Sequence, residues 1–278
     1  MFNVVSEEDI YLHFEKFFAD REVLRKRIKN WIPENCNILL DLGCKNGAIT
    51  YSYSNSSQRV IGIDKNYKYL SSIDRKYPDI TFINGDASSL PFKDSCAEVI
   101  VSTEILQYIP KIEKIFYEAY RVLKPGGIFI ISLPQKGILS KYLKILTYDN
   151  LRTYFRKEGK NSRKELNFHL HSFKDIENLS RDMFNVKVHE EKGFLLYPIS
   201  YVFIEVLTWL TSVLLPDTKK QERSLIIFLY SKLLFSSFRL LFWFIGLLMI
   251  IDSNLSFWKF SYSLIVSLQK ILPEKAGD

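Results

Sequence analysis

The chain has 278 residues, of which 47% are hydrophobic and 15% aromatic, and its formal net charge is +7. This length and composition exclude a disordered or collagen-like chain and a small disulfide-stapled domain. The positive charge is local, because residues 136–164 carry nine basic and two acidic side chains, whereas residues 1–135 carry 17 of each. The charge therefore gives only weak support to a nucleic-acid partner.

Three cysteines without a CxxC pair predict neither a disulfide framework nor a metal site. The first residues also lack the basic and apolar regions of a secretory signal, which favours a cytoplasmic location. We therefore expect a reducing compartment and no structural metal.

The elements of the first two thirds follow a regular alternation. Residues 6–30 have the spacing of an amphipathic helix with Ser6 as its N-cap. From residue 37 onward, short apolar runs alternate with helical stretches, which predicts βαβ units around a parallel sheet. The expected strands are residues 38–42, 60–64, 80–84, 98–102 and 127–133, followed by a helix over 173–183 and a strand over 185–190.

The last third is much more apolar. Residues 199–216 and 224–251 are dominated by apolar side chains, and residues 255–272 form a third, more amphipathic segment. We expect helices here, and the cationic Lys232 and Arg239 on one narrow face favour a helix lying in a membrane interface over a simple span. An additional helical cap, buried against the domain or in a dimer, is the alternative. The predicted organisation is thus an α/β domain over residues 1–194, with a basic insertion at 136–164, and a hydrophobic helical, membrane-associated region over 195–278.

Three acidic residues follow the first three expected strands. The run from Ile38 to Gly47 contains an apolar strand, Asp41 and a Gly-containing turn that allows close approach of a ligand to the backbone. Asp64 ends the second strand, where a carboxylate can accept both hydroxyls of a ribose. Asp86 ends the third strand, so the carboxylates should face one crevice.

The chain resembles the class I S-adenosylmethionine-dependent methyltransferases, specifically the group that acts on small molecules and lipids, including quinones. The resemblance covers about residues 5–192. The motifs that carry it are Asp41-Leu42-Gly43-Cys44-x-x-Gly47, Gly62-Ile63-Asp64, Gly85-Asp86-Ala87 with Leu90-Pro91-Phe92, Ser102-Thr103-Glu104-Ile105-Leu106, and Arg121-Val122-Leu123-Lys124-Pro125-Gly126-Gly127. It implies a doubly wound, seven-stranded, mostly parallel sheet.

The same resemblance implies a binding site for S-adenosyl-L-methionine. The turn from Gly43 to Gly47 would cradle the methionine part, and Asp64 would bind the ribose. Asp86 and the Ala87 backbone would read the adenine, and Ser102 would lie beside the sulfonium. The residues assigned to this site are Asp41, Gly43, Cys44, Gly47, Asp64, Lys65, Asp86, Ala87 and Ser102. Lys45 stands where the family usually has glycine, so its side chain should point away from the cofactor or the turn should open.

Two residues are candidates for the chemistry, Glu104 after the fourth strand and His169 before the last predicted helix. An imidazole titrates near neutral pH and could remove a proton from the acceptor. Structural roles are the alternatives: His169 or the nearby His171 would cap or pack against the helix, and Glu104 would anchor the first helix. The sequence Ser102-Thr103-Glu104-Ile105 lacks the Asn/Asp-Pro-Pro-aromatic motif of base-methylating enzymes, which argues against nucleic acid as substrate.

These patterns predict a methyltransferase at the inner face of a membrane, peripheral or monotopic, that methylates an oxygen of a hydrophobic or lipid-linked small molecule. The basic stretch at 136–164 would then meet anionic lipid or hold a phosphate of the acceptor, unless it is merely a solvated insertion. One alternative is an enzyme for a soluble small molecule or a sugar that is only anchored to the membrane. Another is a non-catalytic scaffold that retains the fold.

Overall fold

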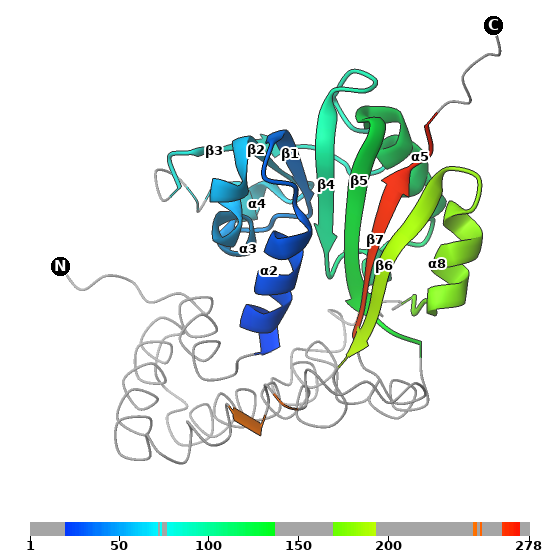
Figure 1. Cartoon of the computed structure of the whole chain (residues 1–278). Helices are drawn as coiled ribbons and strands as arrows, with labels where there is room; N and C mark the ends of the chain where they lie inside the picture. The colour runs from blue at the N-terminus through cyan, green and yellow to red at the C-terminus, as the bar shows by residue number, and fades with distance from the viewer. Residues whose placement is uncertain are drawn as a thin grey trace, which may run out of the picture. The chain divides into compact units, whose positions relative to one another are not determined.

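The computed structural model describes residues 20–71, 73, 77–136, 169–192, 247–248, 251 and 263–272. The chain divides into two compact units, and the one formed by residues 25–136, 167–191 and 263–278 contains the sheet. The other unit comprises residues 1–24, 137–166 and 192–262, few of which are among the described residues. All of the strands belong to the first of these units apart from the final residue of β6 (Figure 1).

Seven strands form one sheet in the order β3-β2-β1-β4-β5-β7-β6. Their bounds are β1 Cys36–Leu42, β2 Ser57–Asp64, β3 Ile80–Asn84, β4 Ala97–Thr103, β5 Leu123–Pro134, β6 Phe184–Lys192 and β7 Ser263–Lys270. The pairs β1·β2, β1·β4, β2·β3 and β4·β5 are parallel, whereas β7 runs antiparallel to β5. The predicted doubly wound, mostly parallel, seven-stranded sheet is confirmed.

Short helices connect the strands and cover the sheet. The helical elements are α2 Asp20–Trp31, α3 Ala48–Ser52, η1 Ser54–Ser56, α4 Tyr67–Leu70, η2 Leu106–Tyr108, α5 Glu113–Val122 and α8 Phe173–Ser180. One core cluster joins buried residues of α5 and α8 to alternate residues of the central strands, with Phe116 packed edge-on against Phe129 and Phe184. Ile28 of α2, Leu39 and Val101 are fully buried but outside this cluster, as expected when both faces of a parallel sheet are covered.

The last strand corrects the expected organisation of the C-terminal region. Residues 255–272 were expected to be part of a hydrophobic helical extension, yet Ser263–Lys270 of this segment form β7 between β5 and β6. Leu264, Ile265, Val266 and Leu268 are almost completely buried. A strand buried on both faces reads as a continuous apolar run, which periodicity cannot distinguish from a helix. The hydrophobic region is therefore an insertion between β6 and β7.

The other expected elements agree closely with the structure where it describes them. Helix α2 corresponds to the second half of the helix expected over 6–30, and Ser6 lies outside the described residues. Helix α8 ends at Ser180, earlier than expected, and β6 extends the strand expected over 185–190 at both ends. Segments 199–216 and 224–251 lie outside the described residues except for 247–248 and 251. Within the part of the chain that is described, no helix is long and apolar enough to span a membrane.

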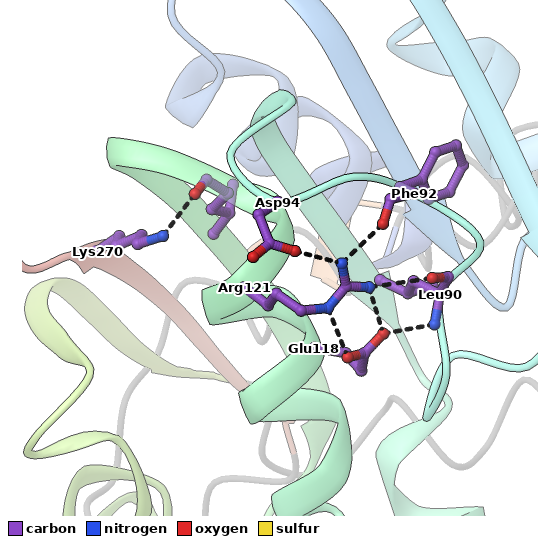
Figure 2. A network of polar contacts seen from close by, with 7 residues as sticks. Leu90, Phe92, Asp94, Glu118, Arg121 and Lys270 are labelled. Atoms are coloured by element: carbon purple, nitrogen blue, oxygen red, sulfur yellow. Dashed lines mark hydrogen bonds and ion pairs between the residues drawn. The ribbon is translucent and has the colours of Figure 1, made fainter.

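Arg121 of α5 holds the loop that follows β3 (Figure 2). Its guanidinium group forms two hydrogen bonds with Glu118, of 2.9 and 2.8 Å, and one with Asp94. It also donates to the backbone oxygens of Phe92 and Leu90. Two of the sequence motifs, Leu90-Pro91-Phe92 and the segment starting at Arg121, are therefore in direct contact in the fold.

The two segments outside the described sheet both leave and re-enter it at one edge. At the ends of the segment 137–168, the backbone N–H of Lys136 donates to the backbone oxygen of His171. Pro134, at the end of β5, pairs with Ser263, at the start of β7. The N–H of Ile271, after β7, donates to the oxygen of Met183, before β6, so Lys192 at the other end of β6 lies near the start of β7. All four connection points therefore lie at the carboxyl edge of the parallel strands, where α/β proteins bind ligands.

Candidate active site

The turn between β1 and α3 depends on left-handed backbone conformations. Gly43 and Gly47 have φ angles of 75° and 77°, and Lys45 has a φ of 49°. The N–H groups of Gly43 and Cys44 both donate to the backbone oxygen of Ile63 in β2. Lys45 is exposed, as its departure from the family pattern requires, although it adopts a conformation that glycine normally supplies.

Gly43 lies in close contact with the loop after β4. A Cβ atom at Gly43 would be 2.2 Å from Cγ2 of Ile105, and one at Gly47 would be 2.6 Å from the ring of Phe82. Gly62 is similarly restricted, by Cys44 and Phe82 at 2.9 Å. The glycines therefore allow the first turn to pack closely against Ile105, after β4, and Phe82, in β3.

Asp64, at the end of β2, is only 9% exposed and is held by backbone donors. Its Oδ2 atom accepts from the N–H of Lys45 at 2.9 Å, and its Oδ1 atom accepts from the N–H of Asn66 at 2.8 Å. A carboxylate has about four acceptor positions, so each oxygen can accept a further hydrogen bond. The side chain is thereby fixed in orientation and retains the capacity to bind two hydroxyls.

Asp86 and Lys65 form an ion pair that joins the ends of β3 and β2. Lys65 Nζ lies 2.7 Å from Asp86 Oδ2, and Asp86 Oδ1 accepts from both the N–H and the hydroxyl of Ser88. Lys65, followed by Ser88, lowers the pKa of Asp86 to about 2. The carboxylate therefore remains ionised at neutral pH, next to the half-buried Ala87.

Asp41 and Cys44 lie beneath the turn. Asp41 is 1% exposed and its Oδ2 atom accepts from the hydroxyl of Thr50 at 2.5 Å. Burial raises the pKa of Asp41 to about 6, against the opposing effect of the Thr50 hydrogen bond. Burial also raises the pKa of the Cys44 thiol, so this cysteine is not a nucleophile. Both residues support the turn from within the protein.

The end of β4 carries Ser102 and Glu104. Ser102 is completely buried, and its hydroxyl has no hydrogen-bond partner among the described residues. Glu104 has a φ of 55°, and its N–H donates to the oxygen of Ser132 in β5 at 2.9 Å. A left-handed conformation in a residue other than glycine is typically found at functional sites, where the surrounding structure maintains it.

Gln107 brings the two candidate catalytic residues to the same place. Its Nε2 atom donates to the backbone oxygen of Glu104 at 2.8 Å, and its own backbone oxygen accepts from the N–H of His169 at 2.9 Å. Glu104 and His169 are 65 positions apart in the chain and are thus both bound to one residue of η2. Sequence reasoning missed Gln107, since a glutamine between apolar residues has no recognisable motif.

Comparisons with known proteins agree with this geometry. Residues 40–131 match the family model described as a methyltransferase domain. A probable S-adenosylmethionine-dependent methyltransferase from Mycolicibacterium smegmatis is 28% identical over 98 residues, which are 35% of this chain and 38% of the relative. A demethylmenaquinone methyltransferase from Renibacterium salmoninarum is 31% identical over 94 residues, 34% of this chain and 40% of the relative. The chain thus spans less than half the length of these two curated relatives.

The solved structure of geranyl diphosphate C-methyltransferase from Streptomyces coelicolor, in complex with Mg²⁺, geranyl diphosphate and S-adenosyl-L-homocysteine, has the same fold. It superposes with a TM-score of 0.54 at 12% identity, covering 90% of this chain and 81% of that chain. At this identity the likeness shows the fold alone. Residues 40–131 thus match a methyltransferase domain, and together with the sheet order this match confirms the resemblance to the class I S-adenosylmethionine-dependent methyltransferases.

Proposed function

We propose that the protein is an S-adenosylmethionine-dependent methyltransferase that acts at a membrane surface on a hydrophobic or lipid-linked small molecule. The observation that carries the acceptor class is topological. The basic segment 137–168 and the hydrophobic segment 193–262 both connect to the sheet at its carboxyl edge, where the acceptor must meet the methyl group. The curated relative from Renibacterium salmoninarum is also named for a quinone substrate.

The residues of the turn and of β2 fit this cofactor. Its sulfonium supplies an electrophilic methyl group. Asp64 retains acceptor capacity for two ribose hydroxyls, and the glycines at 43, 47 and 62 let the turn pack against Ile105 and Phe82, which fixes its backbone in one arrangement. Asp86 and Ala87, at the end of β3, supply a carboxylate and backbone groups for the adenine edge. The Asp86 carboxylate would accept from an exocyclic amine while it remains paired with Lys65.

At the other end of the crevice, the protein has to position a nucleophile in line with the methyl group and remove its proton. Ser102, the last but one residue of β4, would lie beside this position, and His169 and Glu104 are held together through Gln107. We assign His169 as the general base for an acceptor hydroxyl, since a neutral imidazole has a nitrogen that can accept a proton. A hydroxyl has to lose its proton when its oxygen is methylated, so a base at this position fits methylation of an oxygen.

Three described residues of the hydrophobic insertion support contact with a membrane. Leu247, Leu248 and Ile251 are helical, and their exposed fractions are 39%, 37% and 49%. Exposed apolar side chains in a run this apolar mark an interaction surface. Basic side chains in the segment 137–168, which connects to the sheet at its carboxyl edge, would each gain about 1 kcal/mol from anionic lipid headgroups if they lie close to them.

Calorimetric titration with S-adenosylmethionine tests the enzyme against the non-catalytic scaffold. We expect the wild-type chain to bind the cofactor and Asp64→Ala to weaken binding by about tenfold or more, because the ribose hydroxyls lose a charged acceptor. Asp79→Ala is the matched control, since Asp79 is exposed near the start of β3. Absence of binding by the wild type, or equal binding by Asp64→Ala, would favour the scaffold.

Incubation with a labelled methyl donor and a membrane lipid extract tests the acceptor class. We expect label in the organic phase, whereas label only in the aqueous phase would favour the alternative of a soluble acceptor. Flotation of the full chain with anionic liposomes tests the membrane surface, and Leu247→Glu with Leu248→Glu should reduce it several-fold. Tyr117→Glu, at an exposed residue of α5, is the control. The full chain is needed because truncation after β6 would also remove β7.

A further inference from the structure

Buried polar atoms without a partner are concentrated at one end of the carboxyl edge. Among the described residues, seven buried side-chain atoms have no hydrogen-bond partner. Two of them, Asp41 Oδ1 and the Tyr53 hydroxyl, lie near the first turn. The other five are Ser102 Oγ, Gln107 Oε1, Ser132 Oγ, Gln135 Oε1 and His171 Nε2, from the ends of β4 and β5 and the chain beside them.

Two of these residues pair directly through their backbones, and a third contacts the chain two positions before one of them. Gln135 forms an isolated parallel bridge with His171, and the backbone oxygen of Gln107 accepts from His169, two residues earlier. Gln107 and Gln135 are 2% and 6% exposed, and His171 is half-buried. We define the amide cluster as Gln107, Gln135 and His171. It unites residues of η2, the end of β5 and the segment before α8.

The Gln107 and Gln135 side chains of the amide cluster offer acceptor oxygens that have no partner among the described residues. The Nε2 atom of Gln107 is already engaged with Glu104, which orients the Oε1 atom as a free acceptor. Burial lowers the pKa of His171, so its imidazole is neutral at physiological pH. A buried acceptor without a donor costs about 1–3 kcal/mol, and such groups are rare in folded proteins unless something else binds them.

We infer that the amide cluster is the head-group subsite of the acceptor site and takes a hydroxyl-rich head group, such as a sugar or another polyol. Its hydroxyls would donate to Gln107 Oε1 and Gln135 Oε1, and His171 Nε2 would form a third hydrogen bond. The backbone of His169, the proposed base, is bound to Gln107, so a hydroxyl held here is presented to that residue. This assignment rests on the proposed function for its role and names the polar part of the acceptor.

Calorimetric titration of the full-length protein with two amphiphiles of equal chain length tests the subsite. Octyl β-glucoside presents several hydroxyl donors, whereas octylphosphocholine presents none; both are used below their micelle concentrations. We expect the wild type to prefer the glucoside by about tenfold or more. Gln107→Leu and Gln135→Leu should each reduce glucoside affinity by about tenfold and leave phosphocholine affinity unchanged, because leucine lacks an acceptor.

Gln58→Leu is the matched control, since Gln58 is exposed in β2 and the chemical change is the same. Gln135→Met, which keeps an unbranched side chain, replaces Gln135→Leu if that variant does not fold. Equal affinity of the wild type for both amphiphiles, or an unchanged preference in the folded glutamine variants, would overturn the inference and assign the cluster to buried water. The titrations do not require S-adenosylmethionine, so failure of cofactor binding and failure of the subsite are distinguished.

Discussion

The two ends of the carboxyl edge differ in how completely their polar groups are hydrogen-bonded. At the ends of β2 and β3, each oxygen of Asp64 and Asp86 accepts at least one hydrogen bond from within the protein. At the ends of β4 and β5, Ser102, Ser132, Gln107 and Gln135 retain buried polar atoms without partners among the described residues. Asp64 and Asp86 are therefore held in place by the protein itself, whereas the four residues of the second end retain polar atoms for which the described residues supply no partner.

This difference corresponds to two kinds of ligand. A cofactor that is the same in every reaction cycle favours groups held rigidly in one arrangement, since binding then loses less conformational entropy. An acceptor that must arrive and leave can supply hydrogen bonds that are absent between cycles. Unpaired buried acceptors also discriminate strongly, because a ligand without the matching donors leaves them unsatisfied.

The largest effect is expected from Gly43→Ala, which should weaken cofactor binding at the end of the edge formed by the first turn, β2 and β3 (the cofactor end). The new Cβ would lie 2.2 Å from Ile105 in a residue with a φ of 75°, so both overpacking and backbone strain would oppose the native turn. We expect about a hundredfold loss of S-adenosylmethionine affinity by calorimetry. The preference for octyl β-glucoside should remain in the folded variant.

The double variant Gly43→Ala with Ile105→Ala separates the two causes. Removing the Ile105 side chain relieves the clash but not the φ strain, so affinity should recover in part. If the double variant binds S-adenosylmethionine no better than Gly43→Ala alone, the contact between the first turn and the loop after β4 does not control cofactor binding.

Asp41→Asn tests how the buried carboxyl beneath the turn affects stability. Its pKa of about 6 in the folded protein lies above the value of about 3.9 in an unfolded chain. The folded state therefore binds the proton more tightly, and stability falls as pH rises from about 4 to about 6. Asparagine does not titrate, so relative to wild type the variant should gain about 2 kcal/mol between pH 4.5 and pH 7.5, because the wild type loses about 1.4 kcal/mol per pH unit between pH 4.5 and the folded pKa of about 6. Urea denaturation at both pH values measures this, and a pH-independent difference would contradict it.

Arg121→Ala should loosen the loop that leads from the cofactor end to β4. The guanidinium group bonds to Glu118, Asp94 and two backbone oxygens, and all of these lose a donor in the variant. We expect the free energy of unfolding to fall by about 2 kcal/mol in urea denaturation. Lys114→Ala, at an exposed position of the same helix, should change it by less than about 0.5 kcal/mol. Similar values for the two variants would show that the network in Figure 2 contributes little.

The sequence predicted the fold and much of the cofactor end because both depend on local patterns. Strand, glycine turn and terminal carboxylate recur as contiguous motifs, and β1, β2 and β4 lie where these motifs placed them. Strand β7 was wrongly assigned to a helical extension, since its pairing with β5 joins residues about 130 to 140 positions apart. Such a contact has no local signature.

The end of the edge at β4 and β5, proposed to bind the acceptor, was less predictable because its contacts also join distant parts of the chain. Glu104 was proposed from its position after the fourth strand and His169 from its position before the last predicted helix, but their common contact with Gln107 depends on the fold. Gln107 and Gln135 were not identified, because an amide side chain becomes informative only when its burial and missing partner are known. Their proposed role is based on side-chain oxygens without a hydrogen-bond partner, which a residue pattern does not reveal.

Lys45→Gly should have the smallest effect, and it tests whether the lysine side chain hinders cofactor binding. Lys45 has a φ of 49°, a conformation that costs a residue with a Cβ about 1 kcal/mol, and its side chain is exposed. Glycine relieves this strain but increases the entropy of the unfolded chain, so we expect a net gain of only about 0.5 kcal/mol in urea denaturation. Because the N–H of Lys45 binds Asp64, the contact remains in the variant, and cofactor affinity should be unchanged within twofold or so. A clear gain in affinity would instead show that the lysine side chain hinders the cofactor, and that the first end of the edge is less completely assembled than its hydrogen bonds indicate.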